Sequence, residues 1–216
     1  MRRAFDVICA AAGLALLSPL FAVIALAIKL NGGKGSVFYL QPRVGKDGGE
    51  FYLIKFRSMV SSADRHSLLT IVDDPRVTSV GRFLRKYKLD EFPQLINVLK
   101  GDMRLVGPRP ELKRYVDMFR VEYNVLLHDP PGITDPASLA YRHEERLLRG
   151  ECPEQHYVSQ VLPQKLRISL EYSRRRTFFS DLKIVFQTLG GANVGECDSS
   201  STSASQQPSN PVSDKE

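Results

Sequence analysis

Two adjacent carboxylates, Asp90 and Glu91, are the residues of this 216-residue sequence whose types and spacing are best suited to chemistry. They stand just before Phe92-Pro93, where apolar residues at helical spacing predict the start of a helix. The field of a helix N-terminus favours an ionised carboxylate, and an ionised Asp can act as a nucleophile or a metal ligand. The alternative is that the pair only caps the helix, which is the commoner use of such residues.

Basic residues stand on both sides of this acidic pair in the chain. Lys55 and Arg57 end an apolar run before it, and Arg85 lies closer to it. Arg109 stands between two prolines, whose fixed φ angles restrict its backbone, and such an Arg at the start of a helix suits bidentate contact with phosphate. Cations around two carboxylates indicate an anionic, metal-bound substrate such as a nucleoside diphosphate. The remaining cations nearby are expected to be simply solvated: Arg82, Lys86 and Lys88.

The overall charge is compatible with the same kinds of partner. Lys and Arg number 30 against 24 Asp and Glu, which gives a formal net charge of +6. Such an excess suits a nucleic acid, an anionic membrane surface or a phosphorylated substrate without choosing among them. A hydrophobic content of 43% excludes collagen and wholesale disorder. The three cysteines are widely spaced, which argues against a disulfide framework and for a reducing compartment.

The elements that must position these residues begin with an apolar N-terminal segment. Val7–Ile28 contains no charged residue, and a straight helix of that length reaches about 33 Å, enough to cross a hydrocarbon core. Ser18-Pro19 near its middle favours a kink, since Pro19 removes a backbone donor and clashes with the carbonyl of Ala15. Both flanks are basic, so the positive-inside tendency places both ends on the cytoplasmic face. A helix that enters the membrane, bends and returns satisfies both preferences.

Two other interpretations of this segment stay open on the sequence alone. A straight transmembrane span is the simplest, and the apolar length allows it. A cleaved signal peptide is the other, because Ala25-Leu26-Ala27 resembles a small-residue cleavage site after a basic start. Against cleavage, the apolar stretch is longer than usual and continues past that site.

The rest of the chain predicts two strands, four helices and a tail. Glycines between two apolar, aromatic runs indicate a strand–loop–strand unit, and helical periodicity marks the later elements. The tail is predicted to be disordered, because it is rich in serine and has no aromatic residue. The expected strands are Ser36–Leu40 and Phe51–Phe56; the expected helices are residues 78–87 capped by Thr78, 92–100 ended by Gly101, 112–123 and 163–189; the tail is residues 196–216.

Several motifs together resemble the bacterial sugar transferase family, the monotopic phosphoglycosyl transferases. The similarity covers roughly residues 1–190, in order, and motifs this long are hard to obtain by chance. The longest are Leu89-Asp90-Glu91-Phe92-Pro93-Gln94-Leu95, Asn97-Val98-Leu99-Lys100-Gly101-Asp102-Met103 and Leu105-Val106-Gly107-Pro108-Arg109-Pro110. Shorter matches are Ser18-Pro19, Gln41-Pro42-Arg43-Val44-Gly45, Lys55-Phe56-Arg57-Ser58-Met59 and Pro131-Gly132-Ile133-Thr134.

With the expected elements, the resemblance implies an α/β fold that is mostly helical with a small strand element. It implies a monotopic membrane protein in three parts. Residues 1–30 would form a re-entrant helix broken at Ser18-Pro19, residues 31–195 a cytoplasmic catalytic domain with interfacial helices, and residues 196–216 the tail.

The resemblance also implies an enzyme and its partners. Family members transfer a sugar-1-phosphate from a UDP-sugar to polyprenyl (undecaprenyl) phosphate with Mg²⁺, releasing UMP. They work at the cytoplasmic face of the bacterial inner membrane, in the first membrane step of glycoconjugate synthesis, ahead of downstream glycosyltransferases; nucleic acid is not an expected partner.

The site residues are carried over position by position. Asp90 is implied as the nucleophile, forming a phosphosugar-aspartate intermediate, and Glu91 with Asp90 would hold Mg²⁺. The implied phosphate and nucleotide contacts are Lys55, Arg57, Arg85 and Arg109.

The sequence departs from the family pattern in three places. Many members continue the Pro131–Thr134 motif with Gly-Trp-Ala-Gln, whereas this chain has Asp135–Leu139, a segment that could shape the sugar pocket. Arg104 and Lys88 replace serines common in the family and could alter anion contacts.

A membrane-tethered basic binding protein for anionic lipid or nucleic acid is the rival function, and it predicts that Asp90→Asn leaves function intact. A single long apolar segment argues against the polytopic sugar-phosphate transferases.

Overall fold

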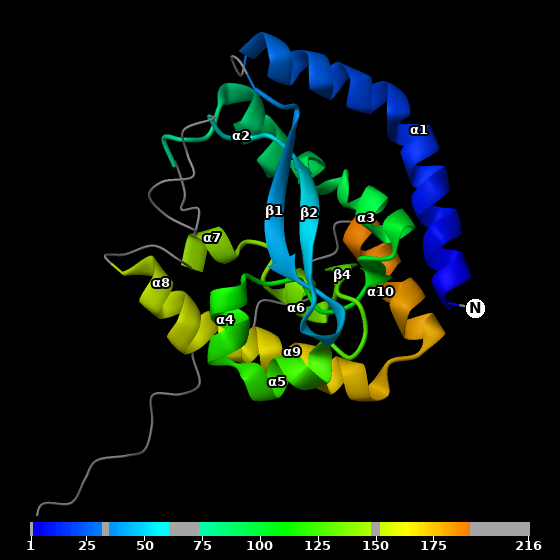
Figure 1. The fold of residues 1–216 in the computed structure, drawn as a ribbon, viewed down its shortest axis with the longest axis vertical. Helices are drawn as coiled ribbons and strands as arrows, with labels where there is room; N and C mark the ends of the chain where they lie inside the picture. Colours follow the sequence, from blue (N-terminus) through cyan, green and yellow to red (C-terminus); the bar gives the residue numbers. More distant parts are fainter. Residues whose placement is uncertain (1, 32–34, 61–73, 148–151, 191–216) are drawn as a thin grey trace, which may run out of the picture.

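The computed structural model describes residues 2–31, 35–60, 74–147 and 152–190, and within these ranges the chain is mostly helical with two small sheets (Figure 1). This confirms the predicted α/β fold that is mostly helical with a small strand element, and the apolar N-terminal helix is compatible with membrane association. The helices are α1 Arg2–Asn31, α2 Ser79–Lys86, α3 Gln94–Lys100, α4 Lys113–Met118, α5 Arg120–Leu126, α6 Pro136–Ala140, α7 Glu144–Leu147, α8 Pro153–His156, α9 Leu162–Arg175 and α10 Phe178–Gly190. The strands are β1 Phe38–Val44, β2 Glu50–Phe56, β3 Arg104–Val106 and β4 Gly132–Thr134. The predicted tail, residues 196–216, lies outside the described residues.

The predicted strand–loop–strand unit is an antiparallel hairpin of β1 and β2. Its first strand is longer than expected and runs to Val44, because the chain reverses only at the glycine-rich turn and pairing is complete up to Val44 opposite Glu50. Pro42 is tolerated inside β1 because a two-stranded sheet leaves one edge of each strand without a partner. The second sheet pairs β3 with β4 in parallel.

Two predicted helices have the expected ends. Thr78 caps α2, where its side-chain oxygen accepts a hydrogen bond from the amide of Gly81 at 2.9 Å. Gly101 ends α3 with a φ of 102°, a left-handed conformation that glycine adopts without strain.

The helix predicted over residues 112–123 is wrong as a single element. It is divided into α4 and α5 at Phe119, whose φ of −121° and ψ of 46° are not helical. The periodicity across the break persists because Tyr115 of α4 and Tyr123 of α5 both enter one core cluster. Packing into one core cluster therefore produces the same apolar periodicity in the sequence that a single continuous helix would show.

The helix predicted over residues 163–189 is likewise two helices, α9 and α10. Arg176 between them is extended, and Thr177 and Ser180 cap the start of α10 by exchanging hydrogen bonds between side chains and amides. The Arg176 guanidinium turns inward, donating to Asp181 at 2.8 Å and to the carbonyl of Val106 at 2.6 Å. Arg176 therefore links the junction of α9 and α10 to β3 through a side chain that is only 9% exposed.

The N-terminal helix α1 remains helical through Pro19, so Ser18-Pro19 lies inside one continuous element. Figure 1 shows α1 bending along its length to pass over the end of the molecule toward α2. We attribute this bend to Pro19, since prolines within helices remove a hydrogen bond and kink them. The hydroxyl of Ser18 donates to the carbonyl of Ala15 at 2.8 Å, the acceptor that Pro19 leaves without its helical donor.

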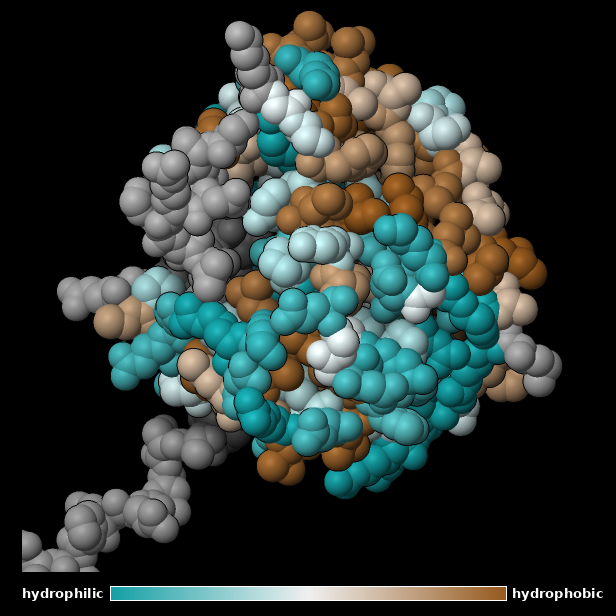
Figure 2. Space-filling model, in the orientation of Figure 1, coloured by the Kyte–Doolittle hydropathy of each residue, from teal (hydrophilic) through white to brown (hydrophobic). Residues whose placement is uncertain are grey.

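Most of the apolar surface of α1 faces outward. Leu16 and Leu30, for example, are 80% and 76% exposed. Figure 2 shows hydrophobic residues gathered along the side and end of the molecule where α1 runs, in contrast to the hydrophilic face below. By length and composition α1 is the one helix of the described residues that could cross a membrane.

The inner side of α1 packs along the body at two places. Ala10 lies in a buried cluster with Leu53 of β2 and Val98 of α3. Nearer its C-terminal end, α1 contributes residues to a second cluster that reaches α2. The buried members of that cluster are Ile24, Ile28, Phe56 and Leu84.

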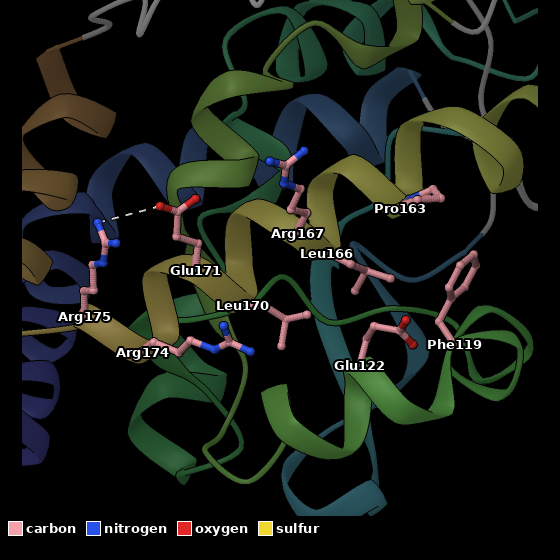
Figure 3. Close-up of a pocket in the computed structure, with 9 residues that line it drawn as sticks. All are labelled: Phe119, Glu122, Pro163, Leu166, Arg167, Leu170, Glu171, Arg174 and Arg175. Atoms are coloured by element: carbon pink, nitrogen blue, oxygen red, sulfur yellow. Dashed lines mark ion pairs between the residues drawn. The ribbon is translucent and has the colours of Figure 1, made fainter.

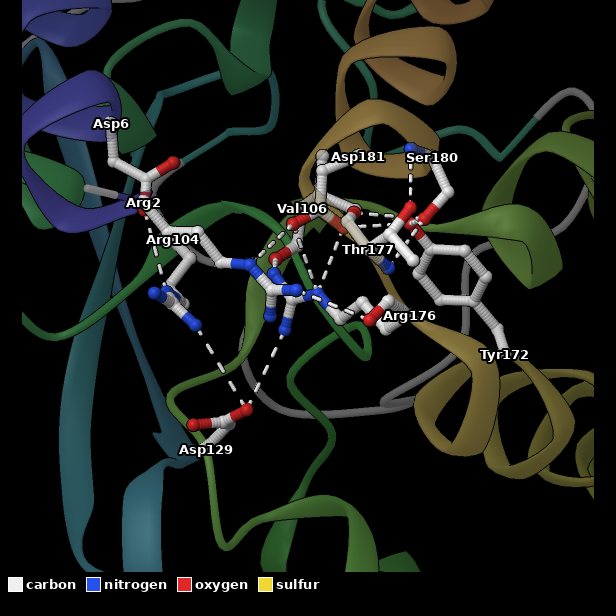
Figure 4. A network of polar contacts seen from close by, with 10 residues as sticks. All are labelled: Arg2, Asp6, Arg104, Val106, Asp129, Tyr172, Arg176, Thr177, Ser180 and Asp181. Carbon is white, nitrogen blue, oxygen red and sulfur yellow. Dashed lines mark hydrogen bonds and ion pairs between the residues drawn. The ribbon is translucent and has the colours of Figure 1, made fainter.

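Charged contacts hold the first turns of α1 against the body (Figure 4). Arg104 Nε of β3 lies 3.4 Å from the Asp6 carboxylate. Arg2 donates to the carbonyl of Arg176 at 3.1 Å, and Arg3 donates to a carbonyl of α3 at 3.2 Å. The sequence placed Arg104 among possible anion contacts, whereas its charge is engaged with Asp6 of α1.

The same network reaches the junction of α9 and α10. Asp129 lies 3.9 Å from Arg104 and 3.6 Å from Arg176, and Asp181 accepts from Arg176 and from the hydroxyl of Tyr172. The N-terminal end of α1 is therefore tied to β3 and to α10 by one continuous set of charges, which we call the α1 clamp.

Candidate active site

The acidic pair lies in a 3₁₀ turn, Leu89–Glu91, that connects α2 to α3. The sequence predicted the pair at the N-terminus of the helix itself; the structure gives it a turn of its own ahead of Pro93, which immediately precedes α3. Lys88 has a φ of 56°, an uncommon left-handed conformation for a non-glycine residue, and it turns the chain into this position. Asp90 is buried there, with 7% of its surface exposed.

Glu91 is the meeting point of two of the predicted cations. Its Oε1 accepts a hydrogen bond from Lys55 Nζ at 3.2 Å and another from Arg109 Nη2. Burial acts to raise the pKa of Glu91, but the charges of Arg109 and then Lys55 outweigh it and hold that pKa well below its ordinary value. Glu91 is therefore a stably ionised carboxylate.

Asp90 has a different environment. Burial raises its pKa, the charge of Glu91 adds to the rise, and the cations Lys55, Arg85 and Lys88 oppose it. The sequence favoured an easily ionised Asp at a helix end, and the direction of this shift is opposite because burial is the largest cause. Within the described residues, the buried Oδ1 of Asp90 has no hydrogen-bond partner. The pair thus combines a carboxylate whose Oε1 accepts from two cations with a carboxylate whose Oδ1 has no hydrogen-bond partner among the described residues.

The other two predicted cations, Arg85 and Arg57, make different contacts. Arg85 donates from Nε to the hydroxyl of Ser58 at 2.9 Å and acts on Asp90 through its charge. Arg57 is buried just past β2, and its amide donates to the carbonyl of Val37 at 2.8 Å. The structure therefore brings Lys55 and Arg109 into direct contact with the pair and Arg85 within its electrostatic range. Ser18 and Pro19 lie in the exposed part of α1.

A buried group that sequence reasoning missed fixes the segment carrying Arg109. Glu111 accepts from Arg43 at 3.1 Å, from the hydroxyl of Tyr157 at 2.7 Å and from the amide of Leu112 at 3.2 Å. Burial acts to raise the pKa of Glu111, but Arg43 and the other donors hold it below its ordinary value. Arg43 lies within the Gln41–Gly45 motif, and Glu111 directly follows the Leu105–Pro110 motif. Their position in or beside these motifs was the signal in the sequence that could have identified them.

A small cavity of ~20 Å³ lies behind Arg109, about the volume that holds one water molecule. Asp135 and Lys165 line it with Arg109. Asp135 caps α6 by accepting from the amide of Ser138 at 2.8 Å and accepts from Ser169 at 2.6 Å. The first residue of the segment that departs from the family pattern therefore has a structural role beside the site.

The larger cavity, about 470 Å³, lies elsewhere, between α5 and α9 (Figure 3). Figure 3 shows Leu166 and Leu170 of α9 facing Phe119 and Glu122 across it. None of the predicted site residues is among the described residues that line it. A choice of candidate site by cavity size alone would therefore give a location away from the buried acidic pair.

The pair has the chemistry of a partial magnesium site. Mg²⁺ takes oxygen ligands and is commonly held by one or two carboxylates together with substrate phosphates and water. Asp90 and Glu91 supply adjacent carboxylates, and Asp90 Oδ1 is a buried oxygen without a hydrogen-bond partner among the described residues. The residues present fit a divalent cation that is completed by a phosphorylated substrate.

Comparison with known proteins gives relatives of one kind. The chain is 39% identical over 193 residues to the UDP-glucose:undecaprenyl-phosphate glucose-1-phosphate transferase of Escherichia coli, covering 88% of this chain and 39% of that protein. It is 32% identical over 204 residues to the exopolysaccharide production protein ExoY of Sinorhizobium fredii, covering 87% and 83%. It is 35% identical over 195 residues to the UDP-N-acetylgalactosamine-undecaprenyl-phosphate N-acetylgalactosaminephosphotransferase of Aeromonas hydrophila, covering 88% and 43%.

The chain thus spans about two fifths of two of these relatives and most of the third. The model of the family described as bacterial sugar transferase matches residues 1–193, which include α1, the acidic pair and all of the cations around it. The resemblance drawn from the motifs is confirmed, and the chain belongs to the bacterial sugar transferase family.

Proposed function

We propose that this protein transfers a sugar-1-phosphate from a UDP-sugar to polyprenyl phosphate, with undecaprenyl phosphate as the bacterial acceptor, and releases UMP. The observation that carries the proposal is the buried carboxylate of Asp90, whose Oδ1 has no hydrogen-bond partner among the described residues and which lies among cations. Named relatives that act on undecaprenyl phosphate support the acceptor. The product would then serve downstream glycosyltransferases.

Asp90 is the proposed nucleophile because it combines burial with nearby positive charge. A desolvated carboxylate oxygen that no donor occupies is free to approach phosphorus. Glu91 is a poorer candidate, since both Lys55 and Arg109 bind its Oε1. Asp90 is therefore the carboxylate that reacts, and Glu91 is the carboxylate that positions Lys55 and Arg109.

The reaction proceeds in two displacements. An oxygen of Asp90 forms a bond with the sugar-bearing phosphorus of the donor, while the bond from that phosphorus to the bridging diphosphate oxygen breaks and its electron pair leaves with UMP. A phosphate oxygen of the acceptor then attacks the same phosphorus, and the bond to Asp90 breaks to restore the carboxylate. Ping-pong kinetics are expected from such a covalent intermediate.

The cations of the site serve the charge that develops in both steps. Arg109 and Lys55 are the proposed contacts to the diphosphate, with Arg57 and Arg85 completing the phosphate and nucleotide contacts. Mg²⁺ held by Asp90 and Glu91 would neutralise phosphate charge and act as a Lewis acid. Glu111 holds the segment that carries Arg109 in a fixed position by accepting hydrogen bonds from Arg43 and Tyr157.

The contacts of α1 support a re-entrant rather than a spanning helix. Its first turns are held to the body by the α1 clamp, and its last turns pack against β2 and α2. A helix that crossed the bilayer straight would leave one end on the far side, away from the body. We therefore propose that α1 dips into the cytoplasmic leaflet of the inner membrane, bends at Ser18-Pro19 and returns, which keeps the acidic pair near the lipid headgroups.

The donor sugar is not assigned. The relatives named above carry glucose and N-acetylgalactosamine, so membership of the family leaves the sugar open. The segment Asp135–Leu139 beside the Arg109 cavity remains the proposed place where the sugar is distinguished.

The test is release of UMP from a panel of UDP-sugars by protein in nanodiscs that contain undecaprenyl phosphate and Mg²⁺. Asp90→Asn should abolish release with the preferred sugar and leave membrane association intact. Asp117→Asn on α4 is the matched control, because that carboxylate is surface-exposed and pairs only weakly with Arg120. Full activity of Asp90→Asn, or salt-sensitive binding of anionic lipid or nucleic acid without turnover, would favour the tethered binding protein instead.

A further inference from the structure

One face of α2, together with Tyr87 at its C-terminal cap, carries two exposed aromatic rings and two exposed cations. Phe83 and Tyr87 are 57% and 54% exposed, and their ring centroids lie 4.9 Å apart. Arg82 and Lys86 are exposed beside them, and the Lys86 ammonium lies 5.4 Å from the centre of the Tyr87 ring. Positions 82, 83, 86 and 87 fall together on a helix surface, so these groups form one patch, which we call the α2 patch.

The opposite face of α2 is fixed against the body and against α1. Leu84 is buried in the cluster that contains Ile24 and Ile28 of α1. Gly81 lies so close to Ser58 that an added Cβ would meet the Ser58 carbonyl oxygen at 1.9 Å. α2 therefore has a defined position against the returning end of α1, and the α2 patch lies on its other, exposed face.

The same helix leads directly into the acidic pair. Arg85 of α2 binds Ser58 and acts on Asp90 through its charge, and the turn holding Asp90 follows after Lys88. The helix that carries the α2 patch therefore contacts both α1 and the turn that holds Asp90.

We propose that the α2 patch binds the polyprenyl-phosphate acceptor, the aromatic pair holding the first isoprene units and the two cations attracting the phosphate. This inference rests on the proposed function and names where its lipid substrate docks. Arg82 and Lys86 were expected to be merely solvated; their position beside paired exposed aromatics assigns them to a ligand with an apolar chain and an anionic head. Aromatic rings with one apolar and one wet side are suited to such an interface.

The experiment separates acceptor binding from donor chemistry. Phe83→Ser with Tyr87→Ser, and separately Arg82→Gln with Lys86→Gln, are prepared in nanodiscs with varied undecaprenyl phosphate. Each pair should raise the KM for undecaprenyl phosphate about tenfold. UMP formed in a single turnover without acceptor, which reports the first displacement, should stay unchanged. The matched control is Val121→Ser with Val125→Ser on α5, two exposed apolar residues outside the α2 patch, and it should leave both measurements unchanged.

A second arm distinguishes the acceptor from ordinary lipid headgroups. Flotation with vesicles of phosphatidylglycerol and phosphatidylcholine, without undecaprenyl phosphate, should show equal binding of the variants and the unsubstituted protein. Loss of vesicle binding would overturn the proposal by making the patch a general membrane contact, and an unchanged acceptor KM would overturn it directly. If the unsubstituted protein transfers no sugar phosphate, the proposed function itself fails, which is a different result from normal transfer with an unchanged KM.

Discussion

The ammonium of Lys55 lies 3.2 Å from Oε1 of Glu91, the same carboxylate oxygen to which Arg109 donates. A strand, a 3₁₀ turn and a proline-flanked segment thus meet at a single atom. The two cations repel each other, and a negative charge on Glu91 offsets that repulsion, which agrees with the lowered pKa of Glu91. Glu91 therefore holds Lys55 and Arg109, the proposed phosphate contacts, beside Asp90.

Removal of Lys55 should impair catalysis strongly. Lys55→Met leaves Glu91 with Arg109 as its remaining described donor and removes a charge that faces Asp90. We expect kcat/KM for the UDP-sugar to fall about 100-fold, the scale seen when one preorganised donor is lost. Lys55→Arg should recover part of that loss. Lys113→Met on the exposed side of α4 is the control, and an equal loss there would make the effect one of net charge.

Glu111 should make stability depend on pH in a defined direction. Its pKa in the folded protein lies below the ordinary value of 4.5, so its stabilising contribution is complete above about pH 4.5. That contribution is lost as the pH falls from there through the lower pKa of the folded state. Thermal unfolding in nanodiscs should therefore show Glu111→Gln less stable than the unsubstituted protein at pH 7, with the difference shrinking below pH 4.5. A difference that is constant with pH would show that Glu111 is not ionised in the folded protein.

Gly81 should tolerate no side chain. A Cβ at this position would lie 1.9 Å from the carbonyl oxygen of Ser58, a backbone atom that cannot rotate away. Gly81→Ala should cost about 1–3 kcal/mol of unfolding free energy, as other overpacked contacts do, and should displace Ser58 from Arg85. Gly190→Ala is the control, because nothing lies within 4 Å of its added Cβ. Equal melting temperatures of the two variants would contradict the close approach of α2.

The α1 clamp should be needed to hold α1 on the body. Arg104→Ala leaves the buried Asp6 carboxylate without its cation, a change that typically costs about 3–5 kcal/mol. Hydrogen exchange should increase in the first turns of α1 while the hairpin stays protected. Arg120→Ala breaks only an exposed pair with Asp117 and should cost less than about 1 kcal/mol.

A paired replacement checks that prediction. Asp6→Asn combined with Arg104→Ser removes both charges and restores the serine common in the family, so exchange in α1 should return toward the original rate. Unaltered exchange in Arg104→Ala would show that the clamp contributes nothing to docking.

The local features of this protein were readable from its sequence. Thr78 and Gly101 mark helix ends because their side chains or backbone freedom act within a few residues. The apolar N-terminal segment and its proline also act locally, and they predicted a kink at Ser18-Pro19 while a straight span and a signal peptide stayed open. The structure has one helix that continues through Pro19 and bends along its length. Asp90 and Glu91 drew attention as an acidic pair ahead of a helix for the same reason.

The tertiary structure decided what depends on burial and on residues far apart in the chain. The breaks at Phe119 and Arg176 follow from packing partners elsewhere, which a continuous apolar period cannot reveal. Burial raises the pKa of Asp90, opposite to the effect expected of a helix end. The meeting of Lys55 and Arg109 at one oxygen required the hairpin, the turn and the proline segment to be placed together. Interactions between neighbouring residues can be predicted from the sequence. The desolvation of a side chain and the charges around it depend on the assembled fold.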